Sequence, residues 1–233
     1  MKSKVVVLAF SIVFACSLGI CAQEAPSTSV SGGGVLVKGW TGQIDAKEQA
    51  AGLNLNSAKL VKDGKVLHVT TGPAVTYWNP DNKAKGDYTV SATFSEPKYM
   101  SINDHPHPYG IMIGGNDLGT DQQNYLYCAA YGNGTFIFRG FGPQPFQLGG
   151  RPPKADPAVN KAAGVGQPVT QEVAITVKGD TISCSINKKQ VASFPRSDIV
   201  APGRLRSTDG IYGLRFAHNT DAIVTNFEKT KAR

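Results

Sequence analysis

Three tyrosines at alternating positions are the residues of this 233-residue chain best suited to hold a ligand. If the run YLYCAAY is a β-strand, Tyr125, Tyr127 and Tyr131 point to the same face, because successive side chains of a strand alternate between faces. Aromatic rings stack on the apolar faces of sugars, and phenolic hydroxyls bond to sugar oxygens. The spacing therefore predicts an aromatic, sugar-binding surface on the outward face of a sheet.

Two arginines supply polar partners for such a surface. Arg139 follows in the run TFIFRGF, and Arg215 in the run GLRF, so both are expected on neighbouring strands. The alternative is that the tyrosines form a second apolar layer beneath the long segment 142–171. That segment contains six prolines, which exclude it from the centre of a sheet.

A second group of residues is suited to acid–base chemistry. His218 and Asp221 lie close together in FAHNTDAIV, and a histidine beside a carboxylate suits a hydrolase or lyase acting on an activated sugar. The same residues equally fit a turn between two strands. They are weak catalytic candidates, and no catalytic residue is assigned from the sequence.

Two segments contain metal-binding residue types. Asn116, Asp117 and Asp121 in GGNDLGTDQQN offer oxygen ligands of the kind calcium prefers, although turn chemistry also explains them. His105 and His107 alternate in DHPHP, so they reach one metal only if the prolines bend the loop. Zinc usually takes three or four protein ligands, and the other histidines are distant in sequence. We therefore interpret the histidine segment as a proline-stiffened loop and assign no metal or cofactor from the sequence, with calcium kept as the alternative.

Strands must position all of these residues. Alternation in GDYTVSATF puts Tyr88, Val90, Ala92 and Phe94 on one face, which is typical of a half-buried antiparallel strand. Turn signals recur between such runs, at 63–64, 133–134, 179–180 and 187, and a single helical turn fits the stretch 44–55. The pattern predicts an all-β fold, an antiparallel sandwich of two sheets.

The two cysteines that follow the N-terminal region, Cys128 and Cys184, lie at core-facing positions of predicted strands. A disulfide requires Cα atoms within about 7 Å, which facing sheets reach only where they approach closely. The sequence leaves both states open and favours two buried thiols over a disulfide. A catalytic thiol is disfavoured, because no histidine stands at a recognisable partner spacing.

The N-terminal residues have the composition of an export signal. Residues 1–22 combine a basic start, an apolar stretch and small residues before a cleavage point, and predict a signal peptide. A lipoprotein site at Cys16 is the alternative, which Phe14 two residues before it disfavours. We expect a flexible leader at 23–34, one domain at 35–233, and a secreted or periplasmic product without stable membrane insertion.

The basic charge of the chain is scattered. The 24 Lys and Arg and 17 Asp and Glu residues give +7, which falls to +5 if Lys2 and Lys4 leave with the signal. No run of basic residues interleaves with aromatic ones, as nucleic-acid binding would require. The sequence predicts no nucleic-acid partner, and a glycan or cell-envelope polysaccharide is the expected partner.

The order of the strands resembles a known superfamily over roughly residues 58 to 228. The runs GDYTVSATF, YGIMIGGNDL and NYLYCAAYGNGTFIFRGF, followed by VAITVKGDTISCSINKKQVASF and DGIYGLRFAHNTDAIVTNF, resemble the concanavalin A-like (laminin-G-like) lectins and glucanases. Within it the chain is similar to uncharacterised exported bacterial proteins, and more distantly to 3-keto-disaccharide hydrolase-like (DUF1080) domains. The resemblance implies a jelly-roll sandwich. The E-x-D-x-x-E run of the glucanase branch is missing, which argues against retaining glycosidase chemistry.

Three functions follow as hypotheses. The leading one is a non-catalytic carbohydrate-binding or cell-envelope interaction module. The second, implied by the resemblance, is an enzyme acting on modified (3-keto) disaccharides, and the third is a structural envelope protein. An acidic residue near His218 in a tyrosine-lined groove would favour the enzyme, and an aromatic face without titratable groups would favour binding.

Overall fold

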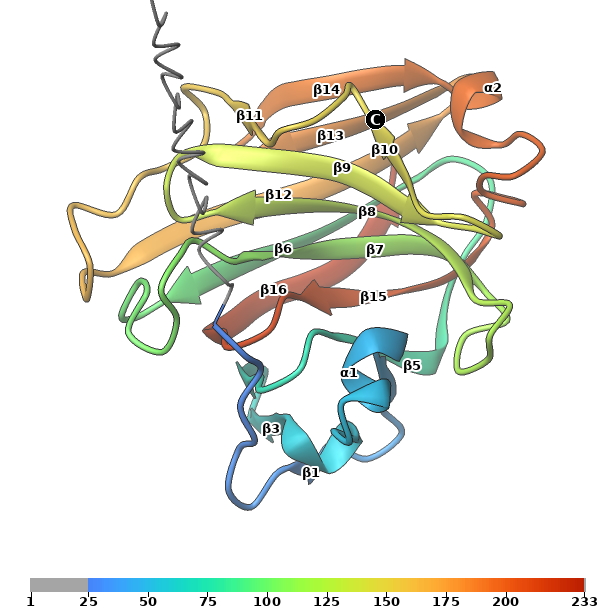
Figure 1. Cartoon of the computed structure of the whole chain (residues 1–233). Coiled ribbons are helices and arrows are strands. Elements are labelled where there is room, and N and C mark those ends of the chain that lie inside the picture. The colour runs from blue at the N-terminus through green and yellow to red at the C-terminus, as the bar shows by residue number, and fades with distance from the viewer. Residues whose placement is uncertain (1–24, 233) are drawn as a thin grey trace, which may run out of the picture.

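The structure, a computed structural model, describes residues 25–232. These residues form two β-sheets that pack face to face as a sandwich (Figure 1). The predicted all-β, two-sheet class is confirmed; all strand pairs are antiparallel except the short pair β1–β3. The first sheet has the order β1 (Gly34–Val35), β3 (Lys59–Asp63), β4 (Val66–Thr70), β16 (Asp221–Lys231), β6 (Tyr88–Glu96), β12 (Val169–Lys178), β13 (Thr181–Ile186) and β14 (Lys189–Pro195).

The second sheet contains the strands that carry the tyrosines. Its order is β10 (Phe146–Leu148), β9 (Thr135–Phe141), β8 (Asn124–Tyr131), β7 (Pro108–Asn116), β15 (Gly210–Phe216), β5 (Val75–Ala84) and β2 (Thr41–Ile44), and β11 (Lys154–Ala155) also pairs with β9. The helical turn predicted within 44–55 is α1 (Ala46–Ala50), followed by the 3-10 turn η1 (Leu55–Ser57). A second short helix, α2 (Arg196–Ile199), follows β14.

The alternation predicted from the sequence is confirmed in both sheets. The four predicted core residues of β6, from Tyr88 to Phe94, lie in the core between the sheets. In β8, Leu126, Cys128 and Ala130 face the same core, whereas Tyr125 and Tyr127 belong to a separate apolar cluster on the other face. The second sheet therefore has an inner face towards the sandwich core and an outer face, and the predicted site lies on the outer face.

The predicted turns join neighbouring strands. The connection between β3 and β4 pairs Asp63 with Val66 around Gly64, whose φ of 57° suits a glycine. The connection between β12 and β13 pairs Lys178 with Thr181 around Gly179, at a φ of 54°. These short connections fix the register, and hence the face that each side chain occupies.

Cys128 and Cys184 form a disulfide between β8 and β13, so the preference for two free thiols was wrong. Both residues are buried, and their Cα atoms are 6.2 Å apart, because the two sheets approach each other closely at this point. The bridge closes 56 residues of chain, which on the chain-entropy account stabilises the folded state by about 4 kcal/mol. It ties the two sheets together directly behind the outer-face tyrosines.

The two segments predicted as irregular are anchored to the sandwich. The proline-rich segment 142–171 contributes β10 and β11, which pair with the edge of β9. The expected leader at 23–34 is described from Ala25 on. There the Thr28 backbone N–H and side-chain hydroxyl both donate to Asn219 Oδ1, at 3.0 and 2.8 Å, and Asn219 Nδ2 donates to the Pro26 carbonyl at 3.1 Å. The predicted signal at 1–22 lies outside the described residues.

Within residues 25–232, none of the helices has the length and apolarity that crossing a membrane requires. The longest, α1, has five residues.

One carboxyl group is buried at the end of a core strand. Glu96 is the last inward-facing residue of β6 and is 5% exposed. The Met100 backbone N–H donates to Oε1 at 3.2 Å, whereas Oε2 has no hydrogen-bond partner. Burial, with a smaller contribution from the charge of Asp221, raises the pKa of Glu96 from 4.5 to about 7.

This raised pKa predicts a pH-dependent stability. Between pH 4.5 and 7 the unfolded chain loses the Glu96 proton while the folded chain keeps it, so stability falls as the pH rises and levels off above pH 7. The gap between the two pKa values corresponds to about 3 kcal/mol. Glu96→Gln is expected to remove this component in urea unfolding at pH 4.5, 6 and 8. The exposed Glu228→Gln is the control; equal pH dependence in wild type and Glu96→Gln would contradict the assignment.

Candidate functional site

The outer face of the second sheet is covered by an apolar layer of its own. The layer consists of buried residues from β5, β7, β8 and β9, with further side chains packed against it: Trp78, Met112, Tyr125, Tyr127, Ala129 and Ile137, with Leu118, Tyr131, Phe141 and Ile211. The sheet is thus buried on both faces along much of β7 and β8. Part of this face therefore matches the alternative considered for the tyrosines, in which they belong to a second apolar layer.

The three predicted tyrosines differ in their access to solvent. Tyr125 is fully buried, and its hydroxyl bonds to Thr76 Oγ1 at 2.9 Å. Tyr127 is 4% exposed and stacks on Phe141, with ring centroids 6.1 Å apart. Tyr131 alone is partly exposed. The expectation of three exposed rings is therefore wrong for Tyr125 and Tyr127, because neighbouring side chains of the outer face cover them.

Arg215 is committed to an internal ion pair. Its two terminal nitrogens donate to both carboxylate oxygens of Asp45, at 2.7 and 2.6 Å, and the guanidinium lies over Tyr127 and Phe141 at 5.8 and 5.5 Å from the ring centres. Arg215 is 7% exposed. Although burial favours the neutral form, the attraction of Asp45 outweighs it and holds the pKa of Arg215 above its ordinary value. Arg215 therefore connects two parts of the outer face: the rings of Tyr127 and Phe141, and Asp45, the residue that precedes α1.

Arg139 is more available than Arg215. It is partly exposed, its guanidinium lies 5.7 Å from the ring centre of Phe141, and it forms no salt bridge with any described residue. Arg139 and Tyr131 line one pocket on the outer face, together with Tyr127 and Arg215. The structure thus brings four of the five predicted ligand-binding residues to one place.

Two further pockets adjoin that pocket. We call the three together the outer groove. Their volumes are about 160, 480 and 390 Å³, and His218 lines all three. The first two share Tyr131, and the first and third share Glu48 of α1. The outer groove therefore runs from the Arg139 region past His218 to the N-terminal segment beside α1.

Three histidines meet in this groove. His105, His107 and His218 each offer a ligand nitrogen, and these atoms lie within 4.8 Å of one another. Pro106 lies between the first two and Pro108 follows them, and Nε2 of His107 is 2.8 Å from Nε2 of His105. The interpretation as a merely stiffened loop missed this arrangement, because chain distance hid the approach of His218, which follows β15.

His218 and Asp221 do not form the expected acid–base pair. Asp221 Oδ1 accepts from Thr70 Oγ1 at 2.9 Å and contacts His68 Nε2 at 2.7 Å, on the first sheet. His218 Nδ1 instead contacts Ser27 Oγ at 3.1 Å. Asp221 is the first residue of β16, whereas His218 lies in the turn before it, so the two side chains point in different directions and contact different residues.

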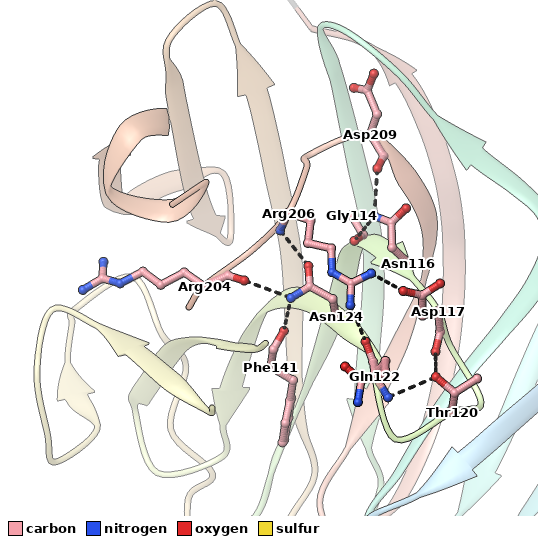
Figure 2. Close-up of polar contacts among 10 residues, drawn as sticks. All are labelled: Gly114, Asn116, Asp117, Thr120, Gln122, Asn124, Phe141, Arg204, Arg206 and Asp209. Carbon is pink, nitrogen blue, oxygen red and sulfur yellow. Dashed lines mark hydrogen bonds and ion pairs between the residues drawn. The ribbon is translucent and has the colours of Figure 1, made fainter. Parts of the chain in front are cut away.

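The predicted calcium turn is held by protein groups (Figure 2). Arg206 forms an ion pair with the Asp117 carboxylate, and the Asn116 amide donates to the carbonyls of Gly114 and Asp209, at 3.0 and 3.2 Å. Nearby, Asn124 bonds Arg204, Arg206 and Phe141, which fixes the loop before β15. Binding of calcium at Asp117 would therefore require the ion pair between Asp117 and Arg206 to break. The hydrogen bonds of Asn116 account for that residue without a metal. Asp121 is exposed.

Sequence reasoning did not find Glu48, which lines the outer groove with His218. Its side chain is 4% exposed, and its Oε1 atom has no hydrogen-bond partner. A lone glutamate in a polar run such as AKEQA carries no signal of burial. Its placement depends on α1 packing beside the outer face.

A larger pocket lies elsewhere. Its volume is about 710 Å³, and Trp40, Tyr212 and Phe227 line it with residues of β4 and β16. The rings of Trp40 and Tyr212 both pack on Phe227, at 5.8 and 5.5 Å between centroids. We treat it as a comparison site, because none of the residues predicted to bind a ligand lines it.

The fold is that of the galectin-like and concanavalin A-like β-sandwiches. The chain is similar to carbohydrate-binding module CBM66 from Bacillus subtilis, with a TM-score of 0.54 and 11% identity over 85% of this chain and 99% of that one. A Bacillus subtilis protein of unknown function with a galectin-like fold gives 0.56 and 15%, over 92% and 98%. An endo-β-1,3-glucanase from Pyrococcus furiosus gives 0.50 and 12%, over 79% and 85%.

These identities show a shared fold alone. No protein-family model matches the chain, and no curated protein matches it. The resemblance to 3-keto-disaccharide hydrolase-like domains consequently stays a prediction.

The Arg215–Asp45 pair gives a test of how the groove is held. Asp45→Asn leaves a buried guanidinium without its counter-charge, which typically costs about 3–5 kcal/mol. We expect that loss in denaturant unfolding, with weaker packing of Tyr127 visible in near-ultraviolet circular dichroism. The exposed Asp63→Asn is the control. A loss no larger than that of the control would show that the pair does not support the outer face.

Proposed function

We propose that this protein binds a carbohydrate in the outer groove. The observation that carries the proposal is the pairing of a partly exposed ring, Tyr131, with the guanidinium of Arg139, which has no salt bridge among the described residues. A tyrosine ring offers an apolar surface to the C–H face of a sugar, and arginine offers several donors to its oxygens. Cell-envelope polysaccharide is the ligand source we favour.

The shape and lining of the groove support this proposal. Carbohydrate ligands need a hollow that combines apolar surface with a few polar groups, and the outer groove supplies Tyr131, Pro108 and Ala217 beside Arg139 and Glu48. The fold it shares with a carbohydrate-binding module is consistent with the proposal and does not identify the ligand.

A glycan array followed by calorimetry tests the proposal. Tyr131→Ala and Arg139→Ala are each expected to weaken binding at least tenfold, equivalent to about 1.4 kcal/mol or more, since each removes a groove contact without emptying the core. Tyr127→Ala is a poorer choice because Tyr127 is buried. Trp40→Ala, in the larger pocket, is the matched control.

Two results would contradict the proposal. Absence of binding to every glycan tested, envelope polysaccharides included, would remove it. Loss of binding in Trp40→Ala with full binding in Tyr131→Ala would place the ligand in the other pocket.

A second candidate function is a hydrolase or lyase acting on modified (3-keto) disaccharides. It is favoured by Glu48, a buried carboxyl with an unpartnered oxygen in the same groove as His218. A positioned carboxyl can transfer a proton to or from a sugar oxygen, which typically contributes 10²–10⁴-fold to a rate. The aromatic groove thus contains titratable groups, the arrangement expected of an enzyme.

Turnover separates the two candidates. An enzyme is expected to cleave a 3-keto disaccharide, and Glu48→Gln is expected to lower kcat/KM at least 100-fold while sugar binding persists. Glu172→Gln, on β12 of the first sheet, is the control. A wild-type protein that binds the sugar and leaves it intact would exclude this candidate.

A further inference from the structure

The three-histidine cluster offers a set of metal ligands that carbohydrate binding by Tyr131 and Arg139 does not use. We propose that His105, His107 and His218 form a site for a divalent transition-metal ion, best suited to Zn²⁺, with one coordination position open to the outer groove. The proposal goes beyond carbohydrate binding and does not depend on it.

The distances in the cluster are close to those that a metal needs. Zinc binds histidine nitrogen at about 2.0–2.1 Å, so three nitrogens around one ion lie roughly 3.3 Å apart. Nε2 of His105 and Nε2 of His107 are 2.8 Å apart, and all three ligand atoms lie within 4.8 Å of one another. The rings of His105 and His218 each lie 4.2 Å from that of His107, between centroids. Small side-chain rotations would bring the three nitrogens to coordination distance.

In two of the three histidines, the nitrogen that faces away from the centre has a hydrogen-bond partner. His105 Nδ1 donates to Asp104 Oδ1 at 2.5 Å, and His218 Nδ1 contacts Ser27 Oγ at 3.1 Å. Metal-bound histidines commonly bond a carboxylate or other oxygen through the second nitrogen, which fixes the ring and its tautomer. In both residues this arrangement directs Nε2 towards the centre of the cluster.

The backbone around the cluster is held by side chains. Asn219 follows His218 and bonds the N-terminal segment at Thr28, while the Asn103 amide donates to the Asn219 carbonyl at 2.8 Å. These bonds join the loop of His105, the turn of His218 and the segment of Ser27. The three ligands therefore come from parts of the chain that are already tied together.

The open position gives the site access to a ligand. His107 and His218 are 5% and 6% exposed, and the cluster lines the pocket of about 480 Å³ with Tyr131 and Thr135. Three histidines with a free fourth position are typical of zinc sites that exchange a water or ligand oxygen, whereas structural sites have four protein ligands. An oxygen of a ligand in the outer groove could take that position.

The donor set selects the kind of metal. Imidazole nitrogens suit zinc, copper and nickel, whereas calcium and magnesium take oxygen ligands. The cluster contains no carboxylate ligand among its three members. A metal requirement of this protein, if measured, is therefore expected to be for a transition metal at the histidines, and not for calcium at the turn of Asp117.

Metal titration of the purified protein, without a polyhistidine tag, tests the proposal. We expect calorimetry to give one Zn²⁺ per chain, and Co²⁺ to give the visible absorption of a four-coordinate site. His107→Ala and His218→Ala are each expected to weaken Zn²⁺ binding more than 100-fold, and Asp104→Asn about 10- to 100-fold. His68→Ala removes the remaining histidine, which contacts Asp221 on the first sheet, and is the matched control.

Several outcomes would overturn the proposal. They are failure of the wild type to bind Zn²⁺ or Co²⁺, equal loss in His68→Ala, and full binding in His107→Ala and His218→Ala. Circular dichroism and thermal midpoints of the metal-free variants show whether each one folds; His105→Gln is the substitute if either alanine variant does not. Zn²⁺ binding without glycan binding would uphold the site and reject the carbohydrate proposal, and the reverse result would do the opposite.

Discussion

Burial of the second sheet on both faces is the constraint on which the rest of the structure depends. β7 and β8 pack inward against the first sheet and outward under an apolar layer that includes Trp78 and Phe141. A charged group buried in such a layer must be paired, because burying an unpaired charge is costly. The Arg215–Asp45 pair meets this requirement, and it also ties the start of α1 to the middle of the sheet.

The outer groove follows from this packing. Since Tyr125 and Tyr127 are covered, Tyr131 and Arg139 are the predicted ligand-binding residues that remain partly exposed, beside the segments that border them. These are α1 and the loops carrying the histidines. The sheet face predicted to be an aromatic platform is instead a groove with charged groups at its edge.

The histidine cluster forms part of the wall of the outer groove. Tyr131 lines both the pocket of the histidines and the adjoining pocket that contains Arg139. A metal at the histidines would place a positive charge beside the proposed sugar site, where it would attract ligand oxygens. Because His218 and Tyr131 line both pockets, one ligand could contact the metal and the sugar-binding side chains together.

The sequence by itself determined the class of fold, the alternation of β6 and β8, and the turns that join neighbouring strands. These features reflect backbone geometry over a few residues, which local residue types specify. The tertiary structure decided the pairing of Asp45 with Arg215 across 170 residues, the disulfide, and the meeting of His218 with His105 and His107. It also decided which tyrosines are exposed. Such contacts depend on how far the sheets approach and which loops meet at their edge, and one strand's pattern contains no information about either.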